Sequence, residues 1–197
     1  MIKLPEIIVF AGPNGSGKST LTELLKPSVA YVNADEIKKS LHCSDMDAAL
    51  LAEKQRETFL AEKTDFCFET VLSTDRNIKL LQKAKSEGYF VRCYYVLTVS
   101  PQINISRVFS RVKQGGHPVP MEKIAKRFTR ALELVPELVS LCDVCHMYDN
   151  SGASMFRIFK KRKTQFFCDP NQFWSLSAIE KLTGIHEFEQ MNLNVTH

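Results

Sequence analysis

A glycine-rich segment near the N-terminus has the residue types and the spacing of a phosphate-binding loop. The segment matches the pattern G-x-x-x-x-G-K-[ST] in full and consists of Gly12, Pro13, Asn14, Gly15, Ser16, Gly17, Lys18, Ser19 and Thr20. Glycines let consecutive backbone N–H groups converge on an anion, and Lys18 supplies a positive charge for the β- and γ-phosphates. The Ser19 hydroxyl is a ligand for Mg²⁺. The segment therefore predicts a binding site for a nucleoside triphosphate and Mg²⁺.

The residues around this segment predict the elements that hold it in place. Residues 7–11 form an apolar, β-branched run typical of a buried strand, and residues 18–26 are expected to form a helix that stops at Pro27. A strand, a tight turn and a helix place the helix N-terminus against the bound anion. The alternative is a glycine-rich turn before an ordinary helix. It would explain the strand and the helix on either side, but not the complete phosphate-loop motif between them.

Two carboxylates are expected close to the phosphates. Asp35 follows a short strand at residues 31–32, and Glu69 lies near the end of a strand expected at residues 66–71. The carboxyl ends of parallel strands share one edge of a sheet, so both side chains would reach the edge that carries the phosphate loop. A carboxylate there can take the proton from an attacking hydroxyl group, and Asp35 is our candidate. The alternatives are a helix N-cap for Asp35 and an ion pair for Glu69.

Four arginines stand in pairs on two predicted helices, Arg107 with Arg111 and Arg127 with Arg130. The members of each pair are one helical turn apart and share a face. Residues 115–120, between the helices, contain a glycine pair and two prolines. We expect residues of about 101–137 to form a helical-hairpin lid that brings guanidinium groups onto the phosphates. A single exposed arginine would more often be merely solvated, so the prediction depends on the hairpin context.

Missing motifs narrow the class of nucleotide-binding protein. The sequence contains neither the N-K-x-D motif of GTPases nor the L-S-G-G-Q motif of transporter-type ATPases, and no strand ends in Asp-Glu as in hydrolytic ATPases. These absences favour a small kinase that transfers the terminal phosphoryl group of ATP to a soluble acceptor. A non-kinase ATPase switch is the alternative class. Another alternative is a kinase of a nucleoside, a polynucleotide or an NAD-type cofactor.

The expected elements alternate along the chain. Strands are expected at residues 7–11, 31–32, 66–71, 90–99 and 144–148, and helices at 18–26, 44–63, 75–87, 101–114 and 121–138. A hairpin at residues 156–168 and a short helix from Ser177 to Gly184 follow. The alternation predicts an α/β P-loop NTPase fold with a parallel sheet flanked by helices. We expect one domain over residues 1–185 and a flexible tail at 186–197.

Composition is consistent with one globular domain. The chain has 197 residues, 44% hydrophobic and 24% charged, with a net charge of +4, which excludes bulk disorder. No window approaches the roughly 18 apolar residues of a membrane span. The N-terminus lacks the basic start of a secretory signal, so we expect a cytoplasmic protein with no membrane partner. Its six cysteines are accordingly expected to be reduced thiols.

Two further motifs are not expected to form functional sites. Residues 142–146 match C-x-x-C-H, the pattern of covalent haem attachment, but they run into an apolar strand without an export signal. A zinc or redox role for these cysteines remains an alternative. Arg157 and residues 160–163 form a basic cluster that we interpret as a solvated hairpin turn. A nucleic-acid partner is therefore not expected.

Several blocks of the sequence, in order, resemble the zeta-toxin-like small P-loop kinases. Besides the phosphate loop, the similarity lies in Asn33-Ala34-Asp35, Glu69-Thr70-Val71-Leu72-Ser73, residues 111–120, Arg127-Phe128 and Tyr148-Asp149-Asn150-Ser151. The blocks G-G-H-x-V-P and E-T-x-L-S are much more specific than the phosphate loop. The resemblance covers about residues 5 to 152.

The resemblance implies an activity and roles for particular residues. It implies ATP-dependent phosphorylation of a sugar hydroxyl, with UDP-N-acetylglucosamine as the acceptor of the best-known members. Asp35 would be the general base, Lys18 the γ-phosphate lysine, and Arg111 and Arg127 the lid arginines, with Arg107 and Arg130 competing for those roles. Acceptor contacts would come from Asn33, Glu69, Thr70 and His117. Members are often toxins that a small helical antitoxin neutralises, so a small antitoxin protein is an expected partner.

Overall fold

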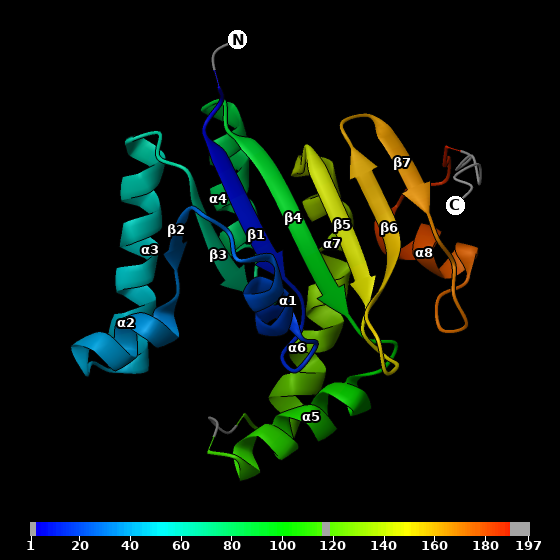
Figure 1. Cartoon of the computed structure of the whole chain (residues 1–197), viewed down its shortest axis with the longest axis horizontal. Coiled ribbons are helices and arrows are strands. Elements are labelled where there is room, and N and C mark those ends of the chain that lie inside the picture. The colour runs from blue at the N-terminus through cyan, green and yellow to red at the C-terminus, as the bar shows by residue number, and fades with distance from the viewer. Residues whose placement is uncertain (1–2, 116–118, 190–197) are drawn as a thin grey trace.

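The computed structural model describes residues 3–115 and 119–189 and contains one seven-stranded sheet (Figure 1). Its strands are β1 (Glu6–Ala11), β2 (Ala30–Val32), β3 (Phe66–Thr70), β4 (Phe90–Leu97), β5 (Val144–Asp149), β6 (Phe156–Arg162) and β7 (Gln165–Cys168). They lie in the order β2-β3-β1-β4-β5-β6-β7. Strands β1 to β5 pair in parallel, and β6 and β7 add an antiparallel edge. The α/β fold with a mainly parallel sheet is thus confirmed.

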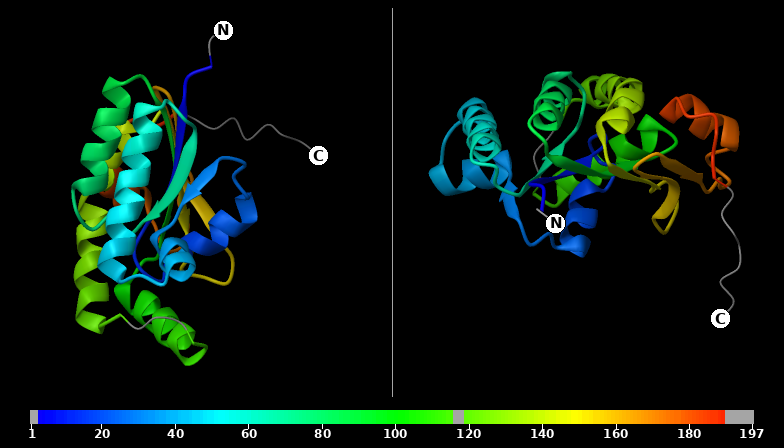
Figure 2. Two further views of the ribbon diagram at one scale, coloured as in Figure 1. Left: turned by 90° about the vertical axis from the view of Figure 1, so that its left-hand side faces the viewer. Right: turned by 90° about the horizontal axis from the view of Figure 1, so that it is seen from above.

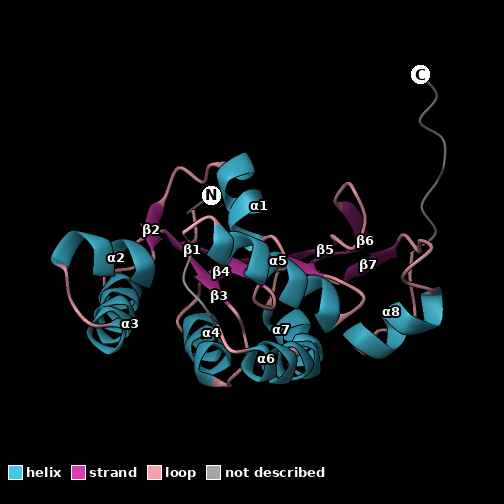
Figure 3. Ribbon diagram, turned by 90° about the horizontal axis from the view of Figure 1, so that it is seen from below, coloured by secondary structure: helices cyan, strands magenta, loops and turns pink. Residues whose placement is uncertain are grey.

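Eight helices are described, and most of them cover one face of the sheet. They are α1 (Lys18–Leu25), α2 (Ala34–Leu41), α3 (Asp45–Ala61), α4 (Arg76–Ser86), α5 (Pro101–Lys113), α6 (Met121–Glu133), α7 (Val135–Leu141) and α8 (Leu176–Thr183). Helices α4, α6, α7 and α8 lie on one face, whereas α1 lies on the opposite face (Figures 2 and 3). Helix α5 lies across the carboxyl ends of the central strands (Figure 1).

The hydrophobic core lies between the sheet and the helices of the more covered face. Strand β1 buries Ile7, Val9, Phe10 and Ala11, as expected for a central parallel strand with neighbours on both faces. The buried Tyr95 of β4 crosses this core and donates a hydrogen bond of 3.0 Å to the Ala131 carbonyl of α6. In the part of the chain that is described, no helix is both long and apolar enough to span a bilayer.

The predicted helix starts are correct where a single capping residue stands near the start of the helix. Ser44 caps α3 by accepting a hydrogen bond from the Asp47 N–H, and Ser100 caps α5 with Pro101 at its first turn. The predicted cap Ser177 was wrong, because α8 begins one residue before it and Ser175 accepts the hydrogen bond from the Ala178 N–H. Ser175 and Ser177 are both residues of a type that caps helices, and both lie at the start of the same helix. The local sequence alone therefore did not show which of them is the N-cap.

Two other predictions on helices need correction. The helix expected at residues 121–138 is divided into α6 and α7, and Pro136 lies in the first turn of α7, where it lacks an N–H to continue the preceding helix. The short helix α2 was not expected as an element. Its N-cap is Asn33, whose side-chain oxygen accepts the Asp35 N–H at 2.8 Å, so Asp35 is not the cap.

The basic cluster lies mostly within a strand rather than in a solvated turn. Lys160, Lys161 and Arg162 belong to β6, and the turn to β7 consists of Lys163 and Thr164. Lys161 is only 8% exposed, and its amine donates hydrogen bonds of 2.7 and 3.2 Å to the carbonyls of Val139 and Ser140. The interpretation as a solvated turn was therefore wrong for Lys161, because strand alternation points it toward the core.

Candidate active site

The phosphate loop joins β1 to α1, and its shape requires glycine at two positions. Gly12 and Gly17 have φ angles of 138° and 106°, in the region that residues with a Cβ rarely adopt. A Cβ at Gly12 would lie 2.0 Å from the Val96 carbonyl oxygen, and one at Gly17 would lie 2.4 Å from the Asn150 amide nitrogen. The loop is therefore packed against β4 and against the segment that follows β5.

Two asparagines from distant segments hold the loop from outside. Asn104 of α5 is fully buried and donates a hydrogen bond of 2.6 Å to the Asn14 carbonyl. Thr98 donates to the side-chain oxygen of Asn104 and fixes its orientation. Asn150 donates a hydrogen bond of 2.7 Å to the Ser16 carbonyl. Both asparagines bind carbonyl oxygens of the loop rather than its N–H groups, so they hold the loop without competing with an anion for those donors. Asn104 was not among the predicted site residues.

Lys18 is held over the loop in a poorly solvated position. Its amine donates a hydrogen bond of 3.0 Å to the Pro13 carbonyl. Burial lowers the pKa of Lys18 to about 8, the negative charge of Glu69 partly opposes this, and the positive charge of Arg111 lowers the pKa further. A triphosphate at this position would supply the negative charge that the ammonium group lacks.

Glu69 accepts hydrogen bonds from three hydroxyl groups. Its carboxylate oxygens lie 2.9 Å from Ser19 Oγ, 2.8 Å from Thr22 Oγ1 and 2.9 Å from the Tyr31 hydroxyl. Burial, followed by the charge of Glu69, raises the pKa of Tyr31, so this phenol stays a donor. The ion pair that we considered for Glu69 is replaced by this network of hydroxyl groups. The hydroxyl of Ser19 and the carboxylate of Glu69 are hard oxygen donors, which is the chemistry that Mg²⁺ prefers.

The same network continues to the turn that carries Asp35. Asn33 donates a hydrogen bond of 2.9 Å from its amide to the Tyr31 hydroxyl, while its oxygen caps α2. Asp35 therefore stands on the first turn of α2 at a fixed backbone position. Its side chain is exposed, as a group that meets an incoming acceptor must be.

One cavity of about 640 Å³ brings these elements together. Of the predicted site residues, its walls include Asn14, Gly15, Gly17, Lys18, Ser19, Thr20, Asn33, Asp35, Glu69, Thr70 and Arg111. Gly12, Pro13 and Ser16 are buried residues of the loop and do not line the cavity. His117 lies outside the described residues. The cavity thus joins the phosphate loop to both carboxylates.

Thr70 has a structural partner on each side. Its hydroxyl oxygen accepts the Leu72 N–H at 2.9 Å and the Asn77 amide at 2.8 Å, and its carbonyl accepts the Gly12 N–H at 3.1 Å. These bonds shape the chain where it leaves β3 and tie it to the start of the phosphate loop. Contact of Thr70 with the acceptor stays a prediction.

The structure places the two arginine pairs differently. Arg107 and Arg111 of α5 line the cavity, and the charge of Arg111 acts on Lys18. Arg127 of α6 is not among the described residues that line it, and Arg130 forms an ion pair of 3.0 Å with Glu133. In this arrangement the cavity is thus lined by the arginine pair of α5, and which arginines contact the phosphates stays a prediction. A lid movement that brings α6 closer stays a prediction.

Substituting the two arginines separately tests this difference. Arg111→Ala is expected to lower kcat about 10²–10³-fold, because a guanidinium donor near the transferred phosphoryl group is lost. Arg127→Ala, the matched change on α6, is expected to lower kcat less than 10-fold. Steady-state kinetics with ATP as the varied substrate measures both. A larger loss in Arg127→Ala would assign the phosphate contact to α6 instead.

Arg56 also lines this cavity, although it was not among the predicted site residues. It comes from α3, its guanidinium carbon lies 5.2 Å from the centre of the Phe68 ring, and its Nε is buried without a described hydrogen-bond partner. Burial lowers the pKa of Arg56 from its ordinary value. No spacing or motif marks this arginine, because only the packing of α3 beside β3 carries it to the cavity.

Comparison with known proteins agrees with this geometry. The family model described as Zeta toxin matches residues 2–161, which is most of the chain. An uncharacterized protein of Haemophilus influenzae (strain ATCC 51907 / DSM 11121 / KW20 / Rd) is 30% identical over 127 residues, covering 61% of this chain and 91% of that protein. The similarity thus covers nearly the whole of that protein but only part of this chain.

Solved structures share the fold at low sequence identity. A crystal structure of AvrRxo1-ORF1:AvrRxo1-ORF2 with sulphate ions superposes with a TM-score of 0.69 at 15% identity, over 91% of this chain and 63% of that chain. The PezAT chromosomal toxin–antitoxin system of Streptococcus pneumoniae gives 0.62 at 16%, over 96% and 82%. The Pnkp1/Rnl/Hen1 RNA repair complex gives 0.56 at 15%, over 87% and 54%. The chain therefore spans less than two thirds of the matched chain in the AvrRxo1-ORF1:AvrRxo1-ORF2 structure.

Family match, fold and site agree with one another. The matched segment contains the phosphate loop, both carboxylates and Arg107, Arg111, Arg127 and Arg130. The chain belongs to the zeta toxin family of small P-loop kinases.

Proposed function

We propose that the protein is an ATP-dependent phosphotransferase that acts on a hydroxyl group of a small-molecule acceptor. The observation that carries this proposal is the shared cavity, whose walls hold the phosphate loop, the Asp35 carboxylate and three arginines. A binding-type ATPase needs the phosphate loop. It does not need an exposed carboxylate, such as that of Asp35, at the position where an acceptor would bind. The family supports the same reaction class.

In the proposed reaction each group has one task. Lys18, Arg107 and Arg111 neutralise the charge that spreads over the transferred phosphoryl group. A carboxylate oxygen of Asp35 accepts the proton of the acceptor hydroxyl as that hydroxyl attacks. Ser19, oriented by Glu69, would hold Mg²⁺, which supplies further charge neutralisation on the phosphates.

We further propose that the acceptor carries phosphate, as a nucleotide sugar such as UDP-N-acetylglucosamine does. Arg56 supports this, since a half-buried guanidinium group on the cavity wall, whose Nε has no described hydrogen-bond partner, is suited to an anion. An uncharged nucleoside would leave it unpaired. A polynucleotide or an NAD-type cofactor also carries phosphate, so these acceptors remain in the same class.

A toxin role with a small antitoxin partner is also proposed. It rests on the family and on the fold shared with the PezAT toxin–antitoxin system. We place the reaction in the cytoplasm, where ATP is abundant.

A mass-spectrometric screen tests the proposed reaction. The full chain is incubated with ATP and Mg²⁺ and with UDP-sugars, nucleosides, NAD or oligonucleotides, and each acceptor is examined for the gain of one phosphoryl group. We expect that gain on UDP-N-acetylglucosamine. Transfer to an uncharged nucleoside alone would overturn the phosphate-bearing acceptor, and ATP hydrolysis with no phosphorylated product would overturn the kinase.

Arg56→Met should weaken acceptor binding without affecting ATP. Methionine keeps an apolar side chain over Phe68 but removes charge-assisted hydrogen bonds, so KM for UDP-N-acetylglucosamine should rise roughly 10- to 100-fold. The control is Arg76→Met, since Arg76 is exposed and paired with Glu53 at 3.2 Å. Equal KM values for the acceptor in both variants would contradict the role of Arg56.

A further inference from the structure

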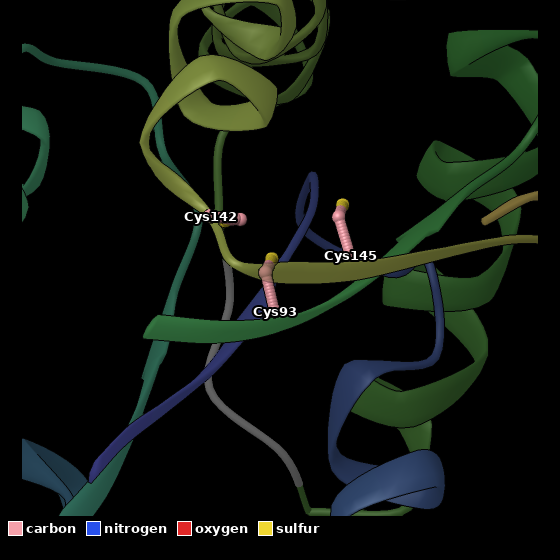
Figure 4. A group of neighbouring side chains, drawn as sticks. All are labelled: Cys93, Cys142 and Cys145. Carbon is pink, nitrogen blue, oxygen red and sulfur yellow. The ribbon is translucent and has the colours of Figure 1, made fainter. Parts of the chain in front are cut away.

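Three buried cysteines come together outside the proposed active site. They are Cys93 on β4, Cys145 on β5, and Cys142 at the end of α7. Their exposed fractions are 0%, 0% and 2%, and all three sulfur atoms lie within 4.8 Å of one another. Figure 4 shows Cys93 and Cys145 rising side by side from neighbouring strands, with Cys142 where the chain leaves the helix.

The fold explains why the three side chains converge. Cys93 and Cys145 are register partners on adjacent parallel strands, so their side chains project from the same face of the sheet. Cys142 is the C-cap of α7, and its N–H donates a hydrogen bond of 3.2 Å to the Leu138 carbonyl. Helix α7 packs on that face of the sheet (Figure 3), so the residue that caps its C-terminus, Cys142, meets the two strand cysteines.

The separation of the sulfur atoms suits a metal ion at their centre. Three sulfurs that bind one ion with metal–sulfur bonds of about 2.3 Å lie about 4.0 Å apart. The observed upper limit of 4.8 Å requires only a small inward movement of the side chains. Cysteine thiolates prefer soft, thiophilic ions such as Cu(I) and Zn²⁺.

The coordination number favours Cu(I) over Zn²⁺. Structural zinc sites have four protein ligands, and in the described residues no His, Asp or Glu joins the three cysteines. His146 follows Cys145 but points to the opposite face, where its ring stacks with Tyr94 at 5.5 Å. Asp143 is occupied by Lys85 at 2.7 Å and by the Val91 N–H at 2.8 Å. The site therefore offers three thiolates and no described fourth ligand.

A buried cation balances the charge of such a centre. Cu(I) held by three thiolates leaves a net negative charge, which is costly in an apolar core. Lys161 is the register partner of Cys145 on β6 and projects from the same face. It is buried, and no described ion pair involves it. Its amine, which also donates hydrogen bonds to the Val139 and Ser140 carbonyls, interacts electrostatically with Cys142 and Cys145 and thus offers positive charge near these sulfurs.

We propose that Cys93, Cys142 and Cys145 form a trigonal Cu(I)-binding site that ties α7 to β4 and β5. Copper enters as Cu⁺, each of the three thiols loses one proton to solvent, and no electron is transferred. Because binding selects the folded arrangement, Cu(I) should raise the melting temperature of the protein.

Competition with a chromophoric chelator tests the site. Full-length reduced protein is titrated anaerobically against the Cu(I) complex of bicinchoninate. We expect one Cu(I) per chain in the unmodified protein and an affinity lower by about 100-fold or more in Cys142→Ser. The matched controls are Cys43→Ser and Cys168→Ser, which change half-buried cysteines outside the cluster and should bind as the unmodified protein does.

X-ray absorption on the unmodified protein gives an answer that does not depend on any variant folding. Three sulfur neighbours at about 2.3 Å from copper are expected. No copper uptake, retention by a folded Cys142→Ser, or copper bound to nitrogen and oxygen would overturn the proposal. Preferential binding of Zn²⁺ in a four-coordinate site would overturn it as well. None of these readouts uses phosphoryl transfer, so the result is independent of the proposed kinase activity.

Discussion

Asp35→Asn is expected to lower kcat for phosphorylation of UDP-N-acetylglucosamine by about 10²–10⁴-fold, the usual contribution of a positioned general base. Asparagine has the same shape as aspartate but cannot take a proton. The turn should keep its structure, because it is the Asp35 backbone N–H, not the side chain, that bonds to Asn33.

The affinity for ATP should remain nearly unchanged in Asp35→Asn, because the phosphate-binding groups lie in the loop and on α5. Isothermal titration with ATP, together with kcat measurements, separates the two effects. The control is Glu36→Gln, which removes the neighbouring carboxylate on the same exposed helix turn and should leave kcat within a factor of two or so. Full transfer by Asp35→Asn would refute the assignment of the base.

Lys18→Met should affect both ATP binding and transfer. Methionine removes the amine that bonds to the Pro13 carbonyl of the phosphate loop, so kcat/KM for ATP should fall about 10²–10³-fold or more. Lys54→Met, an exposed change on α3, is the control and should have no such effect. Normal ATP affinity in Lys18→Met would contradict the proposed phosphate site.

The pKa of Lys18 adds a pH dependence to this prediction. Burial lowers the pKa to about 8 in the nucleotide-free protein, so the amine loses its proton as pH rises through 8 and ATP should bind more weakly above that pH. The unfolded chain keeps this proton to higher pH, so it binds more protons than the folded chain above pH 8. Unfolding free energy should therefore rise with pH in that range.

Two measurements check these signs. The affinity for ATP measured between pH 7 and 9.5 should show a fall in the unmodified protein that is absent in Lys18→Met. Thermal unfolding without nucleotide at pH 7 should show Lys18→Met to be more stable than the unmodified protein, since it removes a poorly solvated ammonium group. Lower stability in the variant would show that the charged amine is well accommodated.

Local patterns in the sequence were sufficient for the nucleotide half of the site. The motif from Gly12 to Thr20 predicted a strand directly before the loop and a helix directly after it. The structure contains β1 and α1 at these positions. The position of Asp35 and Glu69 followed from the rule that parallel strands end at a common edge. Such inferences succeed because the interacting residues are neighbours in sequence or in strand order.

Contacts between distant segments could not be predicted in this way. Asn104 lies 90 residues from the loop carbonyl that it holds, and Asn150 lies 134 residues from its own. Arg56 has no motif around it, and its position depends on how α3 packs beside Phe68. The sequence likewise placed both arginine pairs on a lid, whereas the packing of α5 and α6 decided which pair lines the cavity.

The cysteines show the same division. The sequence determined that two of them stand three residues apart before a strand, a spacing shared by haem, zinc and redox motifs. Only the tertiary structure placed Cys93 beside Cys145, turned His146 to the other face and buried Lys161 next to them. The sequence by itself thus determined the phosphate-loop motif, the shared sheet edge at which its carboxylates were expected, and the family. The tertiary structure decided which arginines, asparagines and cysteines meet, because side-chain encounters depend on strand register and helix packing over the whole chain.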